Sequence, residues 1–534
     1  MKVVTRSQMR AVETSAQEEL GIPSIIMMEN AAIKTLAHCL DYLKDKPGAK
    51  ALIIAGPGAN GGDGLALARH LSLSGVDTSV KFVGDISTVR GDALLNLEIA
   101  RKLGISIETT QKSDNITDVP YDIQSCDLIV DALFGTGLSR KVEGSFEYII
   151  DMVNTYAKHV ISIDIPSGIN ADTGQVLGIA VKADLTVTMA YPKIGLLLHP
   201  GAAYAGRIAV ADISVPESLL ATAEPQASIF TDIEIPGLLP KRKERSNKGS
   251  FGRIYGFAGS AAMPGAASLS ASAAYKAGAG YVCACVIPQT APILHSTLRE
   301  AVTRILPEKG GSFCRKSLDA ISDELAKASV VYIGPGLGRS PLLTEFVFDV
   351  ITSVKCPIVI DADALNAITE NVDILRMIVP PCIITPHPGE MSRLTGLPVE
   401  DILDDTINVA TEFAREYEVI TLLKDARTIV ASPTGHAYIN TTGSSALAKA
   451  GTGDVLTGVV ASFIAQGLDV YTAGMLAAYV HGKAGELAAA ELSNYGVLAT
   501  DVLRYIPKVL DGFAKMDASE SQGSRLRLNE VMLF

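Results

Sequence analysis

The segment ALIIAGPGANGGDGLALARHL (residues 51–71) decides the architecture of the first part of the chain. It opens with apolar residues at consecutive positions, which is typical of a buried parallel strand. A glycine-rich turn from Gly56 to Gly64 and a helical stretch rich in Leu and Ala follow. Glycines allow several backbone N–H groups to point at one anion, and a helix N-terminus adds its positive dipole end. The segment therefore predicts a strand, an anion-binding turn and a helix.

The polar residues of this turn indicate a ligand site. No Lys-Ser/Thr pair follows the glycines, which disfavours a P-loop. A turn needed only for tight packing would explain the glycines but not Asn60 and Asp63 among them. We therefore interpret the turn as part of a binding site.

Similar apolar runs alternate with helical patterns along the rest of the chain. Nearly every run ends in Gly, Asp, Pro or Ser, at the place where open α/β sheets bind their ligands. We predict an α/β fold whose parallel strands are covered by helices on both faces. The predicted strands after the first are SVKFVG, CDLIVDALFG, HVISIDIPSG, LTVTMAY, RIAVADI, RIYGFAG, YVCACVI, SVVYIGPG, PIVIDAD, CIITPHPG, VITLLKD and TIVAS.

The length of 534 residues exceeds the roughly 150 residues of one ordinary domain, so two or more cores are expected. A Pro-, Glu- and Lys-rich segment without a sustained period lies near residues 215–245 and marks the boundary. The expected parts are a first domain (1–220), a linker (221–239), a second domain (240–515) and a polar tail (516–534), which we expect to be loosely held.

Composition excludes several classes of protein. With 48% hydrophobic and 19% charged residues, the chain is a packed globular protein, not a disordered polymer. The apolar run after Asp454 is shorter than the ~20 residues that span a bilayer, so no transmembrane helix is expected. A net charge of −12 argues against a nucleic-acid partner. The one basic cluster, residues 241–248, is either a solvated linker or a segment that faces phosphate or nucleic acid.

The cysteines and the first residues indicate the cytoplasm. Seven cysteines are an odd number and form no CxxC pair, and Cys283 and Cys285 alternate within a predicted buried strand. The N-terminal residues show no apolar signal region.

Three side chains in the first domain offer hard oxygen ligands. Asp131 ends the strand of DLIVDALFGTG, and Ser167 follows the strand of ISIDIPSG. Together with Asn60 they suit a hard cation better than zinc. Each could instead be a turn or helix cap.

Four motifs in order, MRAVETSAQEELGIPSIIMMENAA, GPGANGGDG, DALFGTGLSR and DIPSGINADTG, resemble the NAD(P)H-hydrate epimerase domain over residues 1–220. The resemblance implies a Rossmann-like three-layer αβα domain that interconverts the R and S forms of hydrated NADH and NADPH (NADHX and NADPHX). It implies potassium on Asn60, Asp131 and Ser167, and substrate on Ala59, Asn60, Gly61, Gly62, Asp63, Gly135, Thr136, Gly137, Leu138, Ser139, Arg140, Lys141 and Asp164.

One position departs from the family pattern, and one residue is a candidate for the chemistry. Ala59 replaces the first Asn of the usual NNGGDG motif, which removes one polar side chain but spares the position matched to the metal. Epimerisation at C6 requires a proton carrier, and Asp164 is the candidate, with Lys141 as its electrostatic partner.

A second constellation lies in NTTGSSALAKAGTGDVLTGVVASFIAQG (residues 440–467). Asp454 falls at the predicted start of an apolar helix, where amide donors could hold a transferring phosphoryl group. An N-cap role would explain Asp454 alone but not the Gly-Thr-Gly before it.

AGTGDVLTG resembles the anion-hole and catalytic-base motif of ribokinase-like kinases. With GFAGSAAMPGAASLSASAAYKAGAGYV, VYIGPGLGRS, VIDADALN, TPHPGEMSRLTG and VITLLKDARTIVASPTG, residues 240–510 resemble the ADP- or ATP-dependent NAD(P)H-hydrate dehydratases. The resemblance implies a ribokinase-like αβα domain. It implies hydrate on Ala266, Gly338, His387 and Asp454, and adenine nucleotide on Lys424, Asp425, Ala426, Arg427, Thr428 and Gly453. Asp425 stands where this family commonly has Gly, and His387 alone could be an ordinary loop histidine.

The two resemblances together imply a bifunctional repair enzyme. It would epimerise NAD(P)HX and dehydrate the S form, with ADP phosphorylating the C6 hydroxyl before phosphate is eliminated, Asp454 as base and Mg²⁺ bridging the phosphates. We expect a homo-oligomer. One alternative is a vitamin or sugar kinase with a regulatory first domain. Another is a first domain that only senses nucleotide or binds protein, an alternative that Ala59 keeps open.

Overall fold

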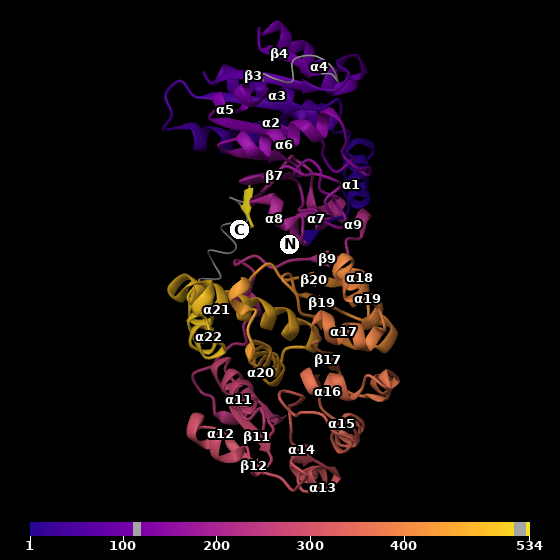
Figure 1. The fold of residues 1–534 in the computed structure, drawn as a ribbon, viewed down its shortest axis with the longest axis vertical. Helices are drawn as coiled ribbons and strands as arrows, with labels where there is room; N and C mark the ends of the chain where they lie inside the picture. Colours follow the sequence, from indigo (N-terminus) through magenta and orange to yellow (C-terminus); the bar gives the residue numbers. More distant parts are fainter. Residues whose placement is uncertain (111–118, 517–529, 534) are drawn as a thin grey trace. The chain divides into compact units, whose positions relative to one another are not determined.

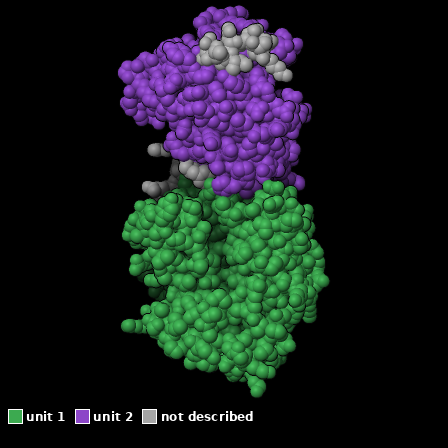
Figure 2. Space-filling view, in the orientation of Figure 1, with its two compact units in different colours: residues 1, 228–522 green, residues 2–227, 523–534 purple. Residues whose placement is uncertain are grey.

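The computed structural model describes residues 1–110, 119–516 and 530–533, and it divides into two compact units (Figure 2). The N-terminal unit consists of residues 2–227 and residues near the C-terminus. The C-terminal unit consists of Met1 and residues 228–522. The division between residues 227 and 228 lies inside the segment 221–239, which was predicted to be a linker. In the described part of the chain, no helix has the length and apolar composition needed to cross a membrane.

The N-terminal unit contains one sheet in the order β21-β8-β7-β6-β5-β2-β3-β4. All neighbours in it are parallel except β21 and β8. Its strands are β2 (Lys50–Ala55), β3 (Asp77–Val83), β4 (Ser106–Thr110), β5 (Leu128–Ala132), β6 (Val160–Ile163), β7 (Leu185–Met189), β8 (Arg207–Ala211) and β21 (Glu530–Met532), and a short β1 (Lys2–Val3) precedes them. Its helices are α1 (Arg6–Glu18), α2 (Ser24–Leu43), α3 (Ala59–Leu73), α4 (Gly91–Lys102), α5 (Val119–Ser125), α6 (Ser145–Tyr156), α7 (Ile194–Leu197), α8 (Ala202–Ala205) and α9 (Leu220–Ala223).

Helices cover both faces of this sheet. Successive side chains of a strand point to opposite faces, so each strand contributes to two cores. Ala51, Ile53 and Ala55 of β2 belong to a core with residues of α1 to α4. Leu52 and Ile54 of the same strand belong to a second core with residues of α5 and α6. Every one of these β2 residues is buried. This is the predicted three-layer αβα arrangement (Figure 1).

The C-terminal unit contains strands in the order β20-β19-β18-β17-β16-β15-β10-β11-β12. Its strands are β10 (Arg253–Phe257), β11 (Tyr281–Val286), β12 (Val302–Ile305), β15 (Val330–Ile333), β16 (Ile358–Ile360), β17 (Cys382–Ile384), β18 (Ile420–Leu423), β19 (Ile429–Ala431) and β20 (Ala437–Ile439), with a β13 (Glu308–Lys309) and β14 (Ser312–Phe313) hairpin and a short β9 (Ala227–Ser228) at the boundary. Its helices are α10 (Ile235–Leu238), α11 (Gly265–Lys276), α12 (Ala291–Thr297), α13 (Arg315–Asp319), α14 (Ser322–Leu325), α15 (Pro341–Ser353), α16 (Ala362–Ala367), α17 (Pro388–Thr395), α18 (Val399–Asp404), α19 (Thr406–Tyr417), α20 (Thr452–Ala465), α21 (Val470–Gly496) and α22 (Ala499–Ala514).

One face of this second sheet packs on α11, α20, α21 and α22 in a single core. The other face includes a cluster of three aromatic rings, Phe257 of β10, Phe313 of β14 and Phe346 of α15. The second unit is therefore also an α/β sandwich, as predicted.

One local prediction about the strands differs from the structure. TIVAS was expected to be parallel, but β19 pairs antiparallel with β18 and β20. Only residues 424–428 separate β18 from β19, and a parallel crossover needs a dozen or more residues. Residues 517–529, most of the tail that was expected to be loosely held, lie outside the described residues, and Glu530–Met532 pair antiparallel with β8.

Candidate active sites

The two sheets share one topological feature: the strand order reverses at β2 in the N-terminal unit and at β10 in the C-terminal unit. In the N-terminal unit, β3 and β5 flank β2, and in the C-terminal unit, β11 and β15 flank β10. In open α/β sheets, ligands bind beyond the carboxyl ends of the strands at such a switch point. Residues 59–63 and 135–141 follow β2 and β5, and Ala266 and Gly338 follow β10 and β15. The other predicted site residues follow strands farther from the switch points.

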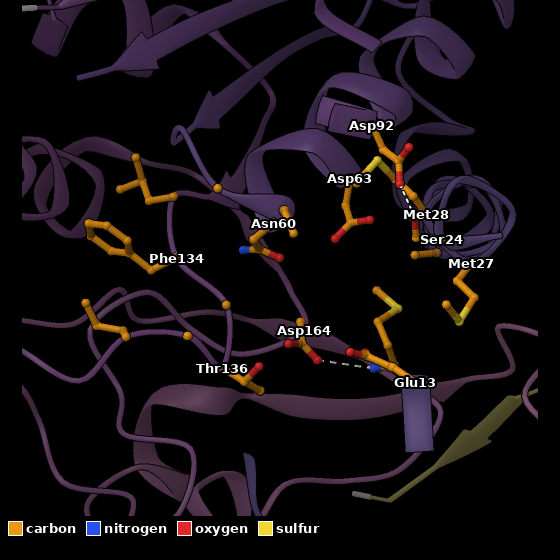
Figure 3. A pocket seen from close by; sticks show the side chains of 18 of the residues that line it. Glu13, Ser24, Met27, Met28, Asn60, Asp63, Asp92, Phe134, Thr136 and Asp164 are labelled. Atoms are coloured by element: carbon orange, nitrogen blue, oxygen red, sulfur yellow. Dashed lines mark hydrogen bonds between the residues drawn. The ribbon is translucent and has the colours of Figure 1, made fainter. Parts of the chain in front are cut away.

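A cavity of about 550 Å³ lies at the switch point of the N-terminal unit. Ala59, Asn60 and Asp63 at the start of α3 line it, with residues 135–140 after β5 and Asp164 after β6. Helices α1 and α2 close it with Glu13, Ser24, Met27 and Met28 (Figure 3). The structure thus brings together most of the residues predicted to hold the hydrate.

Three predicted residues are not among those that line this cavity. A Cβ added at Gly61 would lie 1.8 Å from the Gly56 oxygen, so Gly61 allows the helix to start against the turn. A Cβ at Gly62 would lie 2.7 Å from Cε of Met28. Lys141 is exposed and its chain packs near Gly178. The two glycines shape the turn, and Lys141 is not shown to be the partner of Asp164.

The partner of Asp164 is Lys193, a residue that the motif analysis missed. The Lys193 Nζ donates to Oδ1 of Asp164 over 2.6 Å, and also to the Thr188 hydroxyl and the Met189 carbonyl. Lys193 is only 1% exposed. Asp164 has a positive φ of 68°, an uncommon backbone conformation for a residue other than glycine. The ion pair and the backbone together fix the carboxylate at the cavity wall.

Asn60 gives the clearest indication of a ligand-binding position in this cavity. It is 6% exposed, and neither Oδ1 nor Nδ2 has a hydrogen-bond partner in the described structure. Buried polar groups normally have partners. A Cβ at Gly135 would lie 3.4 Å from Cγ of Asn60 and 3.3 Å from Oδ2 of Asp164, so the loop after β5 approaches both side chains.

Asp131 and Ser167 are also brought together, but they bond to each other. Asp131 is 1% exposed and accepts from the Ser167 hydroxyl and amide, the Ser162 hydroxyl and the Leu133 amide. The Ser167 hydroxyl in turn accepts from the Phe134 amide at 2.9 Å. Burial raises the pKa of Asp131, and the bonds to Ser167 oppose this rise. This network fixes the loop that carries residues 135–140.

Two further carboxyl groups face Asp164 in the cavity, Asp63 and Glu13. Burial, with the nearby charges of Asp164 and Glu13, raises the pKa of Asp63 well above its usual range. Burial also raises the pKa of Glu13, and Lys193 opposes that rise. The cavity therefore combines one carboxylate in an ion pair with two carboxyl groups whose pKa values are raised.

In the C-terminal unit, Asp454 lies in the first turn of α20, after Gly451 with a φ of 90°. Burial and the charge of Asp361 raise the pKa of Asp454 to about 7, and Lys424 opposes this rise. A general base with a pKa near neutrality is effective at physiological pH. Gly453 and the N-terminal amides of α20 lie beside it.

A buried network centred on Asp361 lies behind this carboxyl group. Asp361 is 1% exposed and accepts from Nζ of Lys424 (2.9 Å), the Thr385 hydroxyl (2.7 Å) and the Thr457 hydroxyl on α20 (2.6 Å). Burial alone would raise the pKa of Asp361, but Lys424 and the two hydroxyls outweigh it and hold the pKa below its usual range. A Cβ at Gly453 would lie 3.5 Å from the Lys424 Nζ. The network thus places a lysine ammonium beside the start of α20.

His387 caps helix α17 and faces the same group of charges. Its Nδ1 accepts from the Gly389 and Glu390 amides, and Glu390 accepts from the His387 amide at 2.9 Å. Burial lowers the pKa of His387, and Glu390 opposes this effect. Glu390 also lies 4.0 Å from the Lys424 Nζ. A capping role thus accounts for Nδ1 and leaves Nε2 pointing toward Glu390 at 3.5 Å.

The remaining predicted residues lie on two loops and on α11. Residues 424–428 join β18 to β19, where Asp425 and Ala426 are exposed and Arg427 donates to the Thr441 carbonyl. The amide of Gly338, after β15, donates to Asp363 at 2.8 Å. Ala266 lies in α11 against Gly336 of the same loop region. The outward position of Asp425 separates its carboxylate from the buried network.

The structure adds Glu13, Lys193, Asp361 and Glu390 to the predicted site residues. Lys193 could have been suspected from the sequence, because it is the one charged residue in the apolar segment 185–198. Asp361 lies within VIDADALN, but only the fold shows which of its two aspartates points inward.

Two parallel α/β units, each with polar and charged side chains beyond the carboxyl ends of its strands, define the class of protein as a two-unit α/β enzyme. A family model described as NAD(P)H-hydrate dehydratase matches residues 257–508, and one described as YjeF-related protein N-terminus matches residues 24–195.

Comparison with curated proteins gives the family. The bifunctional NAD(P)H-hydrate repair enzyme of Moorella thermoacetica is 39% identical over 512 residues, covering 96% of this chain and 97% of that protein. The Escherichia coli enzyme of the same name is 30% identical and covers 94% and 92%. The chain belongs to the family of bifunctional NAD(P)H-hydrate repair enzymes, with an epimerase and a dehydratase domain. A crystal structure of the Bacillus subtilis ADP/ATP-dependent NAD(P)H-hydrate dehydratase, crystallised with ATP and Mg²⁺, is 30% identical with a TM-score of 0.47 and covers 53% of this chain and 98% of its own.

Proposed function

We propose that the C-terminal unit uses ADP to phosphorylate the C6 hydroxyl of the S hydrate. Loss of phosphate from C6 and of a proton from C5 then restores the C5–C6 double bond. Hydroxide is a poor leaving group, whereas phosphate leaves readily. The observation that carries this proposal is the position of Asp454, a carboxyl with a pKa of about 7 in the first turn of α20.

The residues of this unit have different roles in the proposed reaction. Asp454 takes the proton from the C6 hydroxyl as the oxygen attacks the terminal phosphorus. The amides of α20 and the Lys424 ammonium stabilise the charge on the transferring group. Residues 424–428 and Gly453 hold the adenine nucleotide, and Ala266, Gly338 and His387 hold the hydrate.

The chemistry of the donor set fits a magnesium ion held mainly by the nucleotide. Among the described residues, no cluster of three His, Cys, Asp or Glu side chains could hold a metal ion. Asp361 and Glu390 already accept bonds from protein donors. Magnesium commonly binds phosphate oxygens and water with one or two carboxylates. Such an ion would neutralise the phosphate charge.

The N-terminal unit supplies the S hydrate by epimerising the R form. Asp164 accepts and returns a proton at C6, while Ala59 to Asp63 and residues 135–141 bind the nucleotide part of the hydrate. Asn60 fits a monovalent cation such as potassium, because its buried amide oxygen has no hydrogen-bond partner among the described residues. Ser167 offers a second oxygen. Asp131 supplies negative charge nearby, although its four acceptor positions already bond protein donors.

The same proposal covers the domain bounds, the location, the oligomeric state and the substrates of the protein. The epimerase domain would comprise residues 1–220 and the dehydratase domain residues 240–515, in a cytoplasmic homo-oligomer that acts on NADHX and NADPHX.

One incubation tests the proposal. Mixed epimers of the hydrate are incubated with the full chain and ADP or ATP, and the recovery of reduced-nicotinamide absorbance is followed. We expect complete recovery with ADP. A stable phosphorylated product without recovery of absorbance would instead identify a kinase, and recovery with ATP alone would exclude ADP as the donor.

A further inference from the structure

The epimerase cavity contains an acidic side chain to which the sequence motifs assign no role, Glu13 on α1. It lines the cavity wall together with Asp63 and Asp164, and the three labelled side chains surround one space (Figure 3). Asn60, nine-tenths buried and without a partner, lines the same space, which indicates that a ligand belongs there.

Helix α1 holds Glu13 in a fixed position. Thr5 and Gln8 form a capping box at the start of the helix, and the Arg6 amide donates to Asp172 at 2.6 Å. Met9, Val12 and Ala16, on the face adjacent to Glu13, are buried in the core. Because both the end and the apolar face of the helix are fixed, Glu13 is a built part of the cavity.

The groups around the cavity differ in their charge partners. Asp164 has the Lys193 ammonium at 2.6 Å and enters the reaction as a carboxylate. Glu13 has no such bond in the described structure, and its pKa is raised by burial and by Asp164, with Lys193 and Arg10 opposing. An ion-paired carboxylate and a buried carboxyl group in one cavity are suited to act as base and acid.

Epimerisation by ring opening requires both an acid and a base. The hydrate carries a hydroxyl and the ring nitrogen N1 on the same carbon, C6. To open the ring, the hydroxyl must lose a proton as the C6–N1 bond breaks, and N1 must gain a proton. Asp164 can serve only one of these two atoms at a time.

We propose that Glu13 is the general acid of the epimerase, an inference that rests on the proposed function of Asp164 as its base. Glu13 donates its proton to N1 while Asp164 accepts the proton of the C6 hydroxyl. The electron pair of the C6–N1 bond moves to N1, and C6 becomes an aldehyde. After rotation about C5–C6, N1 attacks the other face of the aldehyde, Glu13 recovers its proton and Asp164 returns the other to oxygen. No oxidant or further reactant is needed.

Asp63 is the competing candidate for this role. Its pKa is raised further than that of Glu13 because it is more deeply enclosed. An acid that releases and regains a proton in each turnover works best when its pKa is near the working pH. Burial raises the pKa of both carboxyl groups, so the rates and pH profiles of Glu13→Gln and Asp63→Asn decide between them.

The test measures exchange between the R and S hydrates by the full chain without nucleotide. We expect Glu13→Gln to lower the epimerisation kcat by about 10² to 10⁴-fold. Glu18→Gln, an exposed residue of the same helix outside the cavity, is the matched control and should leave the rate unchanged. Because the acid must be protonated, wild-type kcat falls as pH rises through the Glu13 pKa. This alkaline limb should disappear in Glu13→Gln and shift in Glu13→Asp.

The outcomes separate this inference from the proposed function. If the wild-type chain does not exchange the epimers, the proposed role of the N-terminal unit fails. If wild type exchanges and Glu13→Gln does so at a similar rate, or keeps the alkaline limb, Glu13 is not the acid. Loss of the limb in Asp63→Asn alone would assign the role to Asp63. Should Glu13→Gln not fold, an unshifted limb in Glu13→Asp overturns the proposal. Dehydration of pure S hydrate with ADP should be unaffected by Glu13→Gln.

Discussion

Asp454 illustrates how a fold can prepare a single side chain for one task. A carboxyl at the start of a helix is normally favoured as an anion. Here burial and the neighbouring Asp361 charge outweigh that preference and raise its pKa to about 7. The residue can therefore accept a proton near neutral pH and release it again.

Replacing Asp454 by Asn should abolish dehydration while leaving nucleotide binding largely intact. The amide keeps the size of the side chain but cannot accept the hydroxyl proton, so we expect a loss of about 10² to 10⁴-fold in kcat. Recovery of reduced-nicotinamide absorbance measures turnover, and calorimetric titration with ADP measures binding. Near-normal turnover in the variant would contradict the role of Asp454 as base.

The Asp361 network predicts a specific pH effect. Asp454 must be ionised to act, so dehydration should rise as pH increases through about 7. The Asp361 charge raises the pKa of Asp454, and Lys424 lowers it, with Asp363 adding to the rise. In Asp361→Asn the pKa of Asp454 is raised less, so the acidic limb of the kcat profile should move to lower pH.

The matched control is Thr385→Val, which removes one hydrogen bond to Asp361 but keeps its charge. Its acidic limb should stay close to that of wild type. An unmoved limb in Asp361→Asn would show that Asp361 has only a structural role.

The sequence was sufficient for residues that lie inside motifs and insufficient for their distant partners. Asn60, Asp164 and Asp454 each adjoin a glycine-rich or strand-end signal. Lys193 bonds Asp164 across 29 positions, and Thr457 bonds Asp361 across 96. Such pairs depend on which strands are neighbours, and one sequence does not give that order directly.

At the scale of elements, close packing around Gly61 explains the shape of the glycine-rich turn from Gly56 to Gly64. A Cβ at Gly61 would lie 1.8 Å from the Gly56 carbonyl oxygen, a backbone atom that cannot rotate away. We expect Gly61→Ala to displace the start of α3, to destabilise the unit by about 1 to 3 kcal/mol and to impair epimerisation. Thermal unfolding and the exchange rate of the hydrates measure the two effects.

Gly512→Ala provides the comparison, because a Cβ there meets no atom within 4 Å and the residue lies in α22. It should leave the unfolding midpoint unchanged or raise it slightly. If Gly61→Ala were as stable as wild type, the packing argument for the turn would be wrong.

Strands were predicted best where both of their faces are buried. The runs of β2, β5 and β15 are apolar at nearly every position and were located correctly. The edge strand β4, SIETT, is mostly polar and exposed, so its sequence carried no comparable signal. Edge strands need to bury less, and for that reason they are the hardest to recognise.

At the scale of the whole molecule, the two proposed anion sites lie in a chain with a net charge of −12. The overall field therefore disfavours anionic hydrates and nucleotides. In the proposed sites the attraction would come from local groups, such as the amides at the starts of α3 and α20 and the Lys424 ammonium. The N-terminal cavity lies at the switch point of its sheet, where such local groups converge.

The division of labour between the units predicts distinct end points for mixed epimers. Wild type should convert all of the hydrate to reduced cofactor in the presence of ADP. Asp164→Asn should convert the S portion at the normal rate and then slow to the rate of spontaneous exchange, because its dehydratase site is intact. Asp454→Asn should recover no cofactor, although its R and S hydrates still equilibrate. Absorbance at the reduced-nicotinamide band and chromatography of the two epimers measure these end points. Loss of S-hydrate dehydration in Asp164→Asn would show that the two activities depend on one another, because Asp164 lies in the N-terminal unit and Asp454 in the C-terminal unit.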